Sequence, residues 1–326
     1  MMSLGYPLPA YMGGNGFCLG AVLNCEIAYV GPVEFHILLQ GNTPVKNFPG
    51  SFRHAAQGAE NASATVYDVR VSSLGANKAT GDPLLCGAAG RKVFENEEFA
   101  EYVDREIVTR LHFGRIQGER TAFLKAVLDE NRIELYVPDE EHWPPGRRRE
   151  IWTYLMMEKL LMKENAVILH SASVVWDGGA ILFTAPSETG KSTQADLWKK
   201  YTGAVGLNGD RNILMKRDGK WIVCGLPWCG TSPDCLNEAH PLGAIAVVRQ
   251  AEKNMVSKLS AAEKILHISE GITMNRWDRA FTEKAFDLAI LLAKETMIVQ
   301  LDCTMERSAV DCLKDRIRKG NPNENF

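Results

Sequence analysis

One stretch near the middle of the chain limits the possible folds more than any other. The apolar run Ala180–Phe183 leads into the loop Ala185-Pro-Ser-Glu-Thr-Gly-Lys-Ser192, and Thr193–Trp198 follow. This is the strand, loop and helix order of the phosphate-binding motif G-x-x-x-x-G-K-S/T, with Ala185 in the place of the first glycine. We therefore predict an α/β core in which a strand delivers this loop to a helix.

The residue types of the loop suit phosphate binding. Gly190 lacks a Cβ, so the backbone can bend around a phosphate and point N–H groups at it. The helix that begins near Ser192 adds the positive end of its dipole, Lys191 adds a charge, and the Ser192 hydroxyl can reach Mg²⁺. The alternative is an ordinary strand-to-helix turn. The predicted nucleotide-binding residues are Pro186, Ser187, Glu188, Thr189, Gly190, Lys191, Ser192 and Thr193.

Length and charge narrow the class of protein. With 326 residues the chain is long enough for about two domains. Its 45% hydrophobic and 24% charged residues and its net charge of −3 give no reason to expect a nucleic-acid or membrane partner. No apolar run approaches the roughly 18 residues needed to span a membrane. A signal peptide would begin with positive charge, but no Lys or Arg precedes Lys46. We expect a cytoplasmic protein.

The eight cysteines form no C-x-x-C pair. Cys224, Cys229 and Cys235 are close in sequence, but their spacing matches no common zinc pattern. We therefore expect scattered free thiols in a reducing compartment.

Short apolar or alternating runs separated by turn residues fill residues 1–145, and they predict an antiparallel sheet or partial barrel. The acidic segment 95–106 between two of these runs is expected to be a solvated loop or short helix; the alternative is a surface for a basic partner. Pro144-Pro-Gly146 marks a boundary between a β-rich module, residues 1–145, and a second unit, residues 146–326. The runs are Phe17–Tyr29, Val33–Leu39, Ala64–Val71, Ile107–Phe113, Thr121–Leu128 and Arg132–Val137.

Three arginines, Arg147-Arg-Arg149, follow the boundary at once. After them, Glu150–Asn165 has a wide apolar stripe, which predicts a mostly buried helix. Positive charge at a helix start opposes the macrodipole. We favour a solvated turn for these arginines, and the alternative is that they face an anionic substrate or phosphate.

Two further residues are predicted to lie near the phosphate loop. Val167–Trp176 and Ala180–Thr184 flank the turn Asp177-Gly-Gly179, so a hairpin would place His170 beside the strand that delivers Lys191. Asp210 follows the next strand, where a carboxylate can hold Mg²⁺ or accept a hydroxyl proton. A structural histidine and an ordinary Asn-Gly-Asp turn are the alternatives.

The C-terminal third predicts helices with one or two strands. Ser260 and Glu263 form a capping box, Phe281–Lys294 is an apolar helix, and Met297–Leu301 is a strand. Ser308 is expected to cap a last helix that ends at Gly320. Arg276 and Arg279 are expected to be surface residues, with closure on a transferred phosphoryl group as the alternative.

A family resemblance arises from the order of these motifs. His170, the phosphate loop, Leu207-Asn-Gly-Asp-Arg211, a hairpin, the loop Gly225-Leu-Pro-Trp-Cys-Gly230 and a buried strand together resemble the HPr kinase/phosphorylase family, within residues 165–250 above all. The chain looks most similar to the peptide serine kinases of lasso-type modified-peptide clusters. The resemblance implies a P-loop core with a mixed sheet, shared with phosphoenolpyruvate carboxykinase, preceded by a smaller β-rich domain.

The resemblance also implies roles for single residues. Pro186–Thr193 would cradle the β-phosphate, Lys191 would contact β and γ oxygens, and Ser192 and Asp210 would hold Mg²⁺. His170 would pair with the catalytic acid. The chain departs from the family at Gly209, where an aspartate usually serves as the general base. Asp210 would then serve both metal and proton, or His170 would take the proton, or activity would be weak or absent.

These features predict an ATP- and Mg²⁺-dependent kinase that phosphorylates a hydroxyl, on a serine of a peptide or small protein, with Asp210, His170 and Lys191 as catalytic residues. Residues 1–145 would select the acceptor. The alternatives are a carboxykinase-like or small-molecule kinase and a non-catalytic nucleotide sensor. A homo-oligomer is compatible with the resemblance, because proteins with this core often form multimers.

Overall fold

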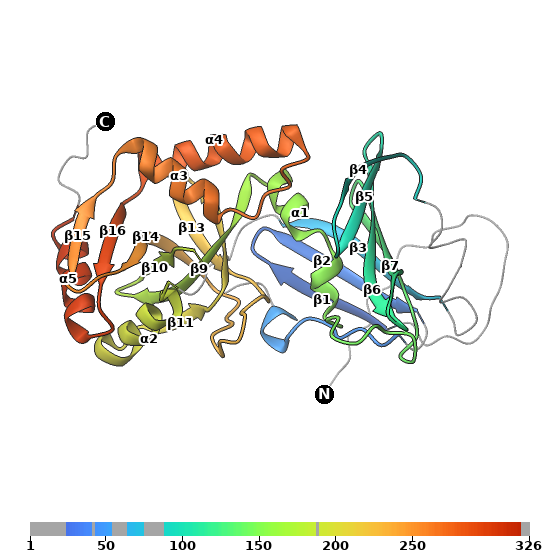
Figure 1. The fold of residues 1–326 in the computed structure, drawn as a ribbon, viewed down its shortest axis with the longest axis horizontal. Helices are drawn as coiled ribbons and strands as arrows, with labels where there is room; N and C mark the ends of the chain where they lie inside the picture. The colour runs from blue at the N-terminus through green and yellow to red at the C-terminus, as the bar shows by residue number, and fades with distance from the viewer. Residues whose placement is uncertain (1–23, 41–42, 54–63, 75–87, 187–188, 321–326) are drawn as a thin grey trace, which may run out of the picture.

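The computed structural model describes residues 24–40, 43–53, 64–74, 88–186 and 189–320. Within this part of the chain the strands form two large mixed sheets, one from residues 24–137 and the other from residues 166–303. Figure 1 shows the first sheet on the right and the second sheet, with most of the helices, on the left. The protein therefore has a mixed α/β fold.

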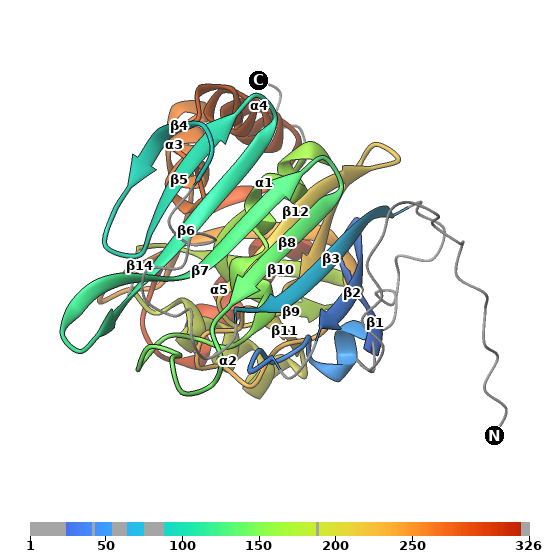
Figure 2. The same ribbon diagram turned by 90° about the vertical axis from the view of Figure 1, so that its right-hand side faces the viewer.

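The first sheet has the strand order β1-β2-β3-β8-β7-β6-β5-β4, which Figure 2 shows face on. The predicted strands are confirmed where the structure describes them, while residues 17–23 of the first predicted run lie outside the described residues. Because β2 pairs with β3 and β3 with β8 in parallel, the expectation of an antiparallel sheet or partial barrel is wrong. Residues 41–64, between β2 and β3, are long enough for the crossover that parallel pairing needs. The strands are β1 (Asn24–Val30), β2 (Val33–Gln40), β3 (Thr65–Ser73), β4 (Arg91–Glu95), β5 (Phe99–Asp104), β6 (Ile107–Ile116), β7 (Glu119–Asp129) and β8 (Arg132–Val137).

In the acidic segment 95–106, β4 and β5 form an antiparallel hairpin. The expected solvated loop is present only as the exposed turns 96–98 and 105–106, while Phe99–Asp104 is a strand. Phe94 and Phe99 lie beside the turn, and both rings pack against Trp277, with centroids 3.7 and 5.8 Å away. Glu101 is buried and accepts a hydrogen bond from Arg110 Nε at 2.8 Å. The acidic composition concealed a strand whose aromatic and paired charged side chains are covered.

The second sheet has the order β10-β9-β12-β13-β14-β16-β15, with β11 paired to β9 and β10 paired also to β14. β14 pairs in parallel with both β10 and β16, so these strands end at the same edge of the sheet. The strands are β9 (Ala166–Trp176), β10 (Gly179–Thr184), β11 (Val205–Asn208), β12 (Arg211–Arg217), β13 (Lys220–Gly225), β14 (Ala239–Gln250), β15 (Met255–Lys258) and β16 (Ile298–Cys303).

Helices cover both faces of the second sheet (Figure 1). Trp198 of α2 and Val310 of α5 belong to one apolar cluster against the sheet, and Ile268 of α3 and Phe281 of α4 belong to another. No helix in the described ranges has both the length and the apolar character needed to cross a membrane. The helices are α1 (Met157–Lys163), α2 (Lys191–Thr202), α3 (Ala261–Gly271), α4 (Arg279–Glu295) and α5 (Arg307–Arg318), with 3₁₀ turns η1 (Gly50–Arg53) and η2 (Ile151–Tyr154).

Two helix predictions need correction, while the capping box of Ser260 and Glu263 is confirmed. The single helix expected over Glu150–Asn165 is broken between η2 and α1 at Met156, which has a φ of 51°. Residues 154–157, on both sides of this break, are all buried. The last helix is capped by Glu306, two residues before the expected Ser308, without a side-chain cap.

The two sheets share an apolar cluster and a buried group of charges. Phe35 of β2 and Ile213 of β12 belong to the same cluster, so the core crosses the boundary expected at residue 145, and that division stays a prediction. Arg110 of β6 donates to Glu158 of α1 at 2.6 Å, and Lys159 lies 3.2 Å from Asp278, which precedes α4. Buried charges of this kind are stable only when each has a partner.

We predict that Arg110→Met lowers the free energy of unfolding by about 3–5 kcal/mol, because it leaves Glu158 buried without a cation and Glu101 with Lys159 alone. Arg132→Met is the matched control, since Arg132 makes an exposed pair with Asp129, and should change it by less than about 1 kcal/mol. Urea denaturation of both variants measures the difference. Equal effects would show that the buried group does not join the sheets.

The loss of unfolding free energy in Arg110→Met should also depend on pH. Burial alone would raise the pKa of Glu158, but Arg110 outweighs burial and holds that pKa below its ordinary value. The stability contributed by ionised Glu158 is therefore present above about pH 4 and lost as the pH falls through the lower folded value. The difference between wild type and variant should shrink in acid. A difference that stayed constant from about pH 7 to about pH 3 would contradict this account.

Candidate functional site

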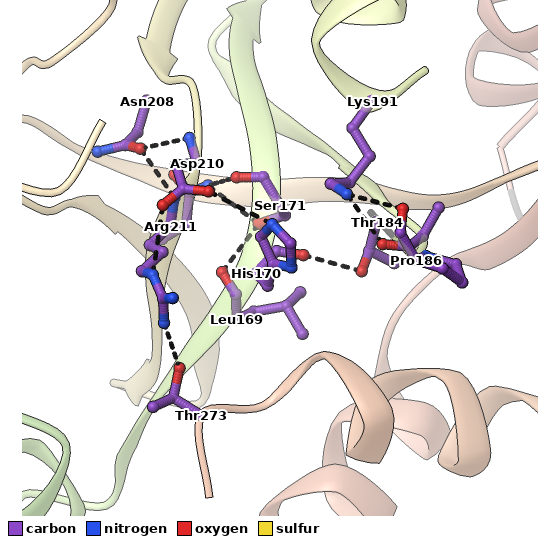
Figure 3. Close-up of polar contacts among 12 residues, drawn as sticks. Leu169, His170, Ser171, Thr184, Pro186, Lys191, Asn208, Asp210, Arg211 and Thr273 are labelled. Carbon is purple, nitrogen blue, oxygen red and sulfur yellow. Dashed lines mark hydrogen bonds and ion pairs between the residues drawn. The ribbon is translucent and has the colours of Figure 1, made fainter. Parts of the chain in front are cut away.

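Strand β9 changes its pairing partner halfway along, and His170 lies at the change. Arg211 of β12 is opposite His170, whereas the next residue, Ser171, is opposite Thr184 at the end of β10. Thr184 Oγ1 also donates to the His170 carbonyl at 3.0 Å. The end of the strand that leads into the phosphate loop and the start of the strand that follows Asp210 therefore meet beside His170 (Figure 3).

The Asp210 carboxylate lies between a histidine and an arginine. His170 Nε2 is 3.3 Å from Oδ1, and Arg211 Nε is 3.3 Å from Oδ2. The hydrogen bond from His170, with the charge of Arg211, outweighs burial and holds the pKa of Asp210 below its ordinary value. The carboxylate is thus ionised at neutral pH, and it can accept a proton or bind a cation.

A buried hydrogen-bond network fixes the turn that carries Asp210 (Figure 3). Asn208 Oδ1 accepts from the backbone N–H groups of Asp210 and Arg211, both at 2.9 Å, and its Nδ2 donates to the Leu226 carbonyl at 2.6 Å. The Asn208 N–H donates to Ser173 Oγ at 3.1 Å, and the Ser173 hydroxyl donates to Asn212 at 2.6 Å. The sequence also forms the Asn-Gly-Asp turn that was the alternative, and this turn holds the half-buried acid in place.

In the loop that the sequence predicts to bind phosphate, the lysine contacts the backbone at the loop's start. Gly190 has a φ of 104° and precedes α2, as the left-handed bend of the loop requires. Lys191 is 8% exposed, and its Nζ donates to the carbonyls of Ala185 and Pro186, both at 3.0 Å. Burial lowers its pKa, although the charge of Asp210 acts the other way. Ser187 and Glu188 lie outside the described residues.

A cavity of ≈ 560 Å³ lies beside the start of α2. Residues 189–194 form one side, and the segments that follow β14 and β16 form the other. Because β10, β14 and β16 are parallel neighbours, this is the carboxyl edge where α/β sheets bind ligands. Gln194 is 2% exposed and its Oε1 has no hydrogen-bond partner among the described residues, which favours a polar ligand.

Magnesium could be held here only together with phosphate oxygens. No group of three or more His, Cys, Asp or Glu side chains suited to a metal occurs in the described part of the chain. Ser192 and Asp210 would offer two oxygen ligands, and Mg²⁺ bound with a nucleotide commonly uses one or two protein ligands plus phosphates and waters. The oxygens of these two side chains suit Mg²⁺ chemically, but Ser192 lines the cavity beside α2 and Asp210 does not.

The loop 226–236 packs tightly over the Asp210 turn and explains Gly209. A Cβ at Gly209 would lie 2.1 Å from Ser232 Cβ, so an aspartate has no room there. Gly230 lies against Asp210, where its Cβ would be 3.3 Å from that of the acid. The Cys229–Cys235 disulfide closes the loop, which corrects the expectation of free thiols at these two positions. The spacing of the two cysteines gave no sign that the loop folds back on itself.

Several residues near the site were missed by sequence reasoning, and others do not reach it. Ser173 and Asn212 stand out only as polar residues inside apolar strands, which was the available signal. Gln194, one turn into the helix, gave no signal. Arg279 pairs with Glu283 on the exposed side of α4, and Arg276 is exposed, so both are surface residues as expected.

Comparison with known proteins gives little. No family profile and no curated protein matches the chain. Among solved structures, it is similar to the Hpr(Ser) kinase/phosphatase from Coxiella burnetii, with 12% identity and a TM-score of 0.29, over 47% of this chain and 91% of that one. A match of this strength assigns neither a family nor an activity.

We predict that Gly209→Ala lowers the free energy of unfolding by about 1–3 kcal/mol, because the added methyl group meets Ser232. Adding Ser232→Gly to Gly209→Ala should restore most of the lost stability. Gly219→Ala is the control, because Gly219 lies in an open turn where a side chain meets only the strain of a positive φ of 76°. Adding Ser232→Gly to Gly219→Ala should restore nothing. Thermal unfolding of the single and double variants measures both effects. Absence of rescue would mean that Ser232 does not exclude a side chain at position 209.

Proposed function

We propose that the protein is a phosphotransferase with an HPr kinase and phosphoenolpyruvate carboxykinase-like P-loop core, which moves the γ-phosphoryl group of ATP to a hydroxyl. The observation that carries this proposal is the partner change of β9 at His170. It brings the strand of a phosphate-binding motif and a supported, ionised carboxylate to the same point of the sheet. In-line phosphoryl transfer needs that combination of positioning and charge more than covalent chemistry.

In this proposal Pro186–Thr193 bind the nucleotide phosphates. Lys191 exchanges its two carbonyl acceptors for β and γ oxygens, which are stronger partners for an ammonium group. Ser192 and Asp210 hold the magnesium ion, which neutralises charge on the phosphates when bound. Gln194 offers its unpaired Oε1 to a donor of the nucleotide.

Asp210 is the better candidate for the general base. His170 donates its hydrogen bond to Asp210, so the imidazole supports the ionised acid. Asp210 also lines a second cavity, described below, from which a hydroxyl could approach. Ser232 fills the space of an acid at position 209, so we assign both the metal and the proton to Asp210.

The acceptor is proposed to be a serine of a peptide or small protein, selected by residues 1–145. A non-catalytic nucleotide sensor is the second candidate, and the exclusion of an acid at Gly209 favours it. The two candidates differ in one measurement, since a sensor binds ADP but transfers no phosphate to any acceptor.

We predict that Lys191→Met weakens the binding of ADP and Mg²⁺ by about 10- to 100-fold, because a charged hydrogen-bond donor to the phosphates is lost. Lys200→Met is the control, since Lys200 is exposed near the far end of the same helix and contacts Tyr201. Titration calorimetry measures both. Equal affinities of wild type and Lys191→Met would overturn the assignment of the nucleotide site.

We predict that Asp210→Asn keeps ADP binding within about 10-fold but lowers phosphoryl transfer from labelled ATP about 10²- to 10⁴-fold, as expected for loss of a general base. Because His170 holds the pKa of Asp210 below its ordinary value of about 3.9, this group should not limit the rate above about pH 5. Transfer by the variant at the wild-type rate would exclude Asp210 as the base.

A further inference from the structure

A second cavity, of ≈ 560 Å³, lies where the two sheets meet. Asp210 and Arg211 line it from the second sheet, and β5, β6 and β7 line it from the first, together with parts of the segment 146–158. The candidate base therefore faces a cavity distinct from the one beside α2. Its volume is typical of sites for small molecules or short peptide segments.

Two of the three consecutive arginines line this cavity. Arg147 and Arg148 line it, whereas Arg149 does not and donates to Glu140 at 2.7 Å. The pair of Arg147 with the exposed Glu98 is long, 3.6 Å, and Arg148 makes no ion pair with any described residue. Arg148 is exposed, so water solvates its charge, but neither guanidinium group has a carboxylate of the described residues at short range. Both are therefore available to pair with an anionic ligand at the cavity.

The rest of the wall is aromatic and contains unpaired polar atoms. Phe99, Tyr154 and Trp228 supply apolar surface. Nε2 of His112 and Oγ1 of Thr153 are buried without a hydrogen-bond partner in the described ranges. Burial, with Arg110 and Arg147, lowers the pKa of His112 to about 3, so the ring is neutral and offers a hydrogen bond rather than a charge.

The buried charges behind the wall hold it in place. Arg110 is fixed between Glu101 and Glu158, and Trp277 Nε1 donates to Glu101 at 2.8 Å. These lining residues therefore have little freedom to fill the cavity themselves. A preformed site loses less free energy to ordering when its ligand binds.

We propose that this cavity binds the phosphoryl acceptor, and that the acceptor is a hydroxyl compound with a carboxylate or phosphate group beside an apolar group. This inference rests on the proposed function. Arg147 and Arg148 pair with the anionic group, the aromatic wall covers the apolar group, and the hydroxyl lies at Asp210. The same chemistry is found in a free hydroxy acid and in a peptide with an acidic residue beside a serine.

The transfer step balances with ATP as the only co-reactant. The acceptor hydroxyl gives its proton to the Asp210 carboxylate, and its oxygen forms a bond to the γ-phosphorus. The bond from that phosphorus to the bridging oxygen breaks, and ADP leaves with the bridging oxygen. Asp210 then releases the proton to solvent.

Binding is tested first with the full chain, by titration calorimetry in the presence of ADP and Mg²⁺. The small-molecule probes are 3-phenyllactate, which carries all three groups, 3-phenylpropane-1,2-diol, which lacks the carboxylate, and lactate, which lacks the ring. The peptide probes are acetyl-Asp-Ser-Phe-amide and acetyl-Asn-Ser-Phe-amide. In at least one of the two probe sets, small molecules or peptides, the acidic aromatic probe should bind at least about 10-fold more tightly than its neutral counterpart.

Matched variants test the arginines. Arg148→Gln, and more strongly Arg147→Gln combined with Arg148→Gln, should lower affinity for the acidic probe about 10-fold or more and leave the neutral probe unchanged. Arg149→Gln removes the same charge from the same run outside the cavity, and should have no effect. ADP affinity should be unchanged in all three, because none of these residues lines the cavity beside α2. Equal melting temperatures exclude misfolding.

The outcomes separate this inference from the proposed function. Transfer of label to an acidic probe that falls in Arg148→Gln but not in Arg149→Gln supports both. Label transfer to peptides without any preference for acidic ones, or equal affinities in Arg148→Gln and wild type, overturns the acceptor assignment and leaves the kinase intact. A third outcome is that ADP binds and the acidic probe binds through the arginines, but no label is transferred to the probe. That outcome overturns the acceptor role and favours the nucleotide sensor.

Discussion

The position of Asp210, on which the proposed function depends, is fixed by the buried side chain of Asn208. Its amide joins the turn before β12 to Leu226 in the covering loop, and its backbone N–H joins the same turn to Ser173 of β9. Because all of these groups are buried and paired, moving the turn would leave several polar groups without partners. Asp210 therefore projects from a rigid support, which is the condition for a carboxylate to act on a bound ligand.

The two sheets depend on each other, although each is formed from its own part of the chain. The sheets contact each other through a shared apolar cluster and through the buried charges around Arg110. Next to these contacts lies the cavity that Asp210 shares with Arg147 and Arg148. Because these contacts hold the two sheets together but leave a cavity between them, a ligand could bind next to Asp210 without rearranging the fold.

The loop 226–236 gives a packing cause for the glycine at position 209. At Gly206, Gly209 and Gly225, a Cβ would lie within 2.2 Å of an atom of this loop. The absence of side chains lets the loop approach the sheet, and Ser232 then occupies the space next to Gly209. A second acid near Asp210 would require a different path for the loop.

The sequence alone determined the hairpin of β9 and β10, the strand, loop and helix around Lys191, and most strands of residues 24–137, because these depend on local periodicity and turn residues. It could not determine the parallel pairing of β3, the break at Met156 or the strands hidden in the acidic segment, since each depends on partners distant in sequence. Only the tertiary structure separated Arg147 and Arg148 from Arg149 and gave the geometry of the pair between His170 and Asp210, which the family resemblance had implied. The physical reason is that local patterns fix backbone conformation, whereas which side chains share a cavity depends on how separate strands pack.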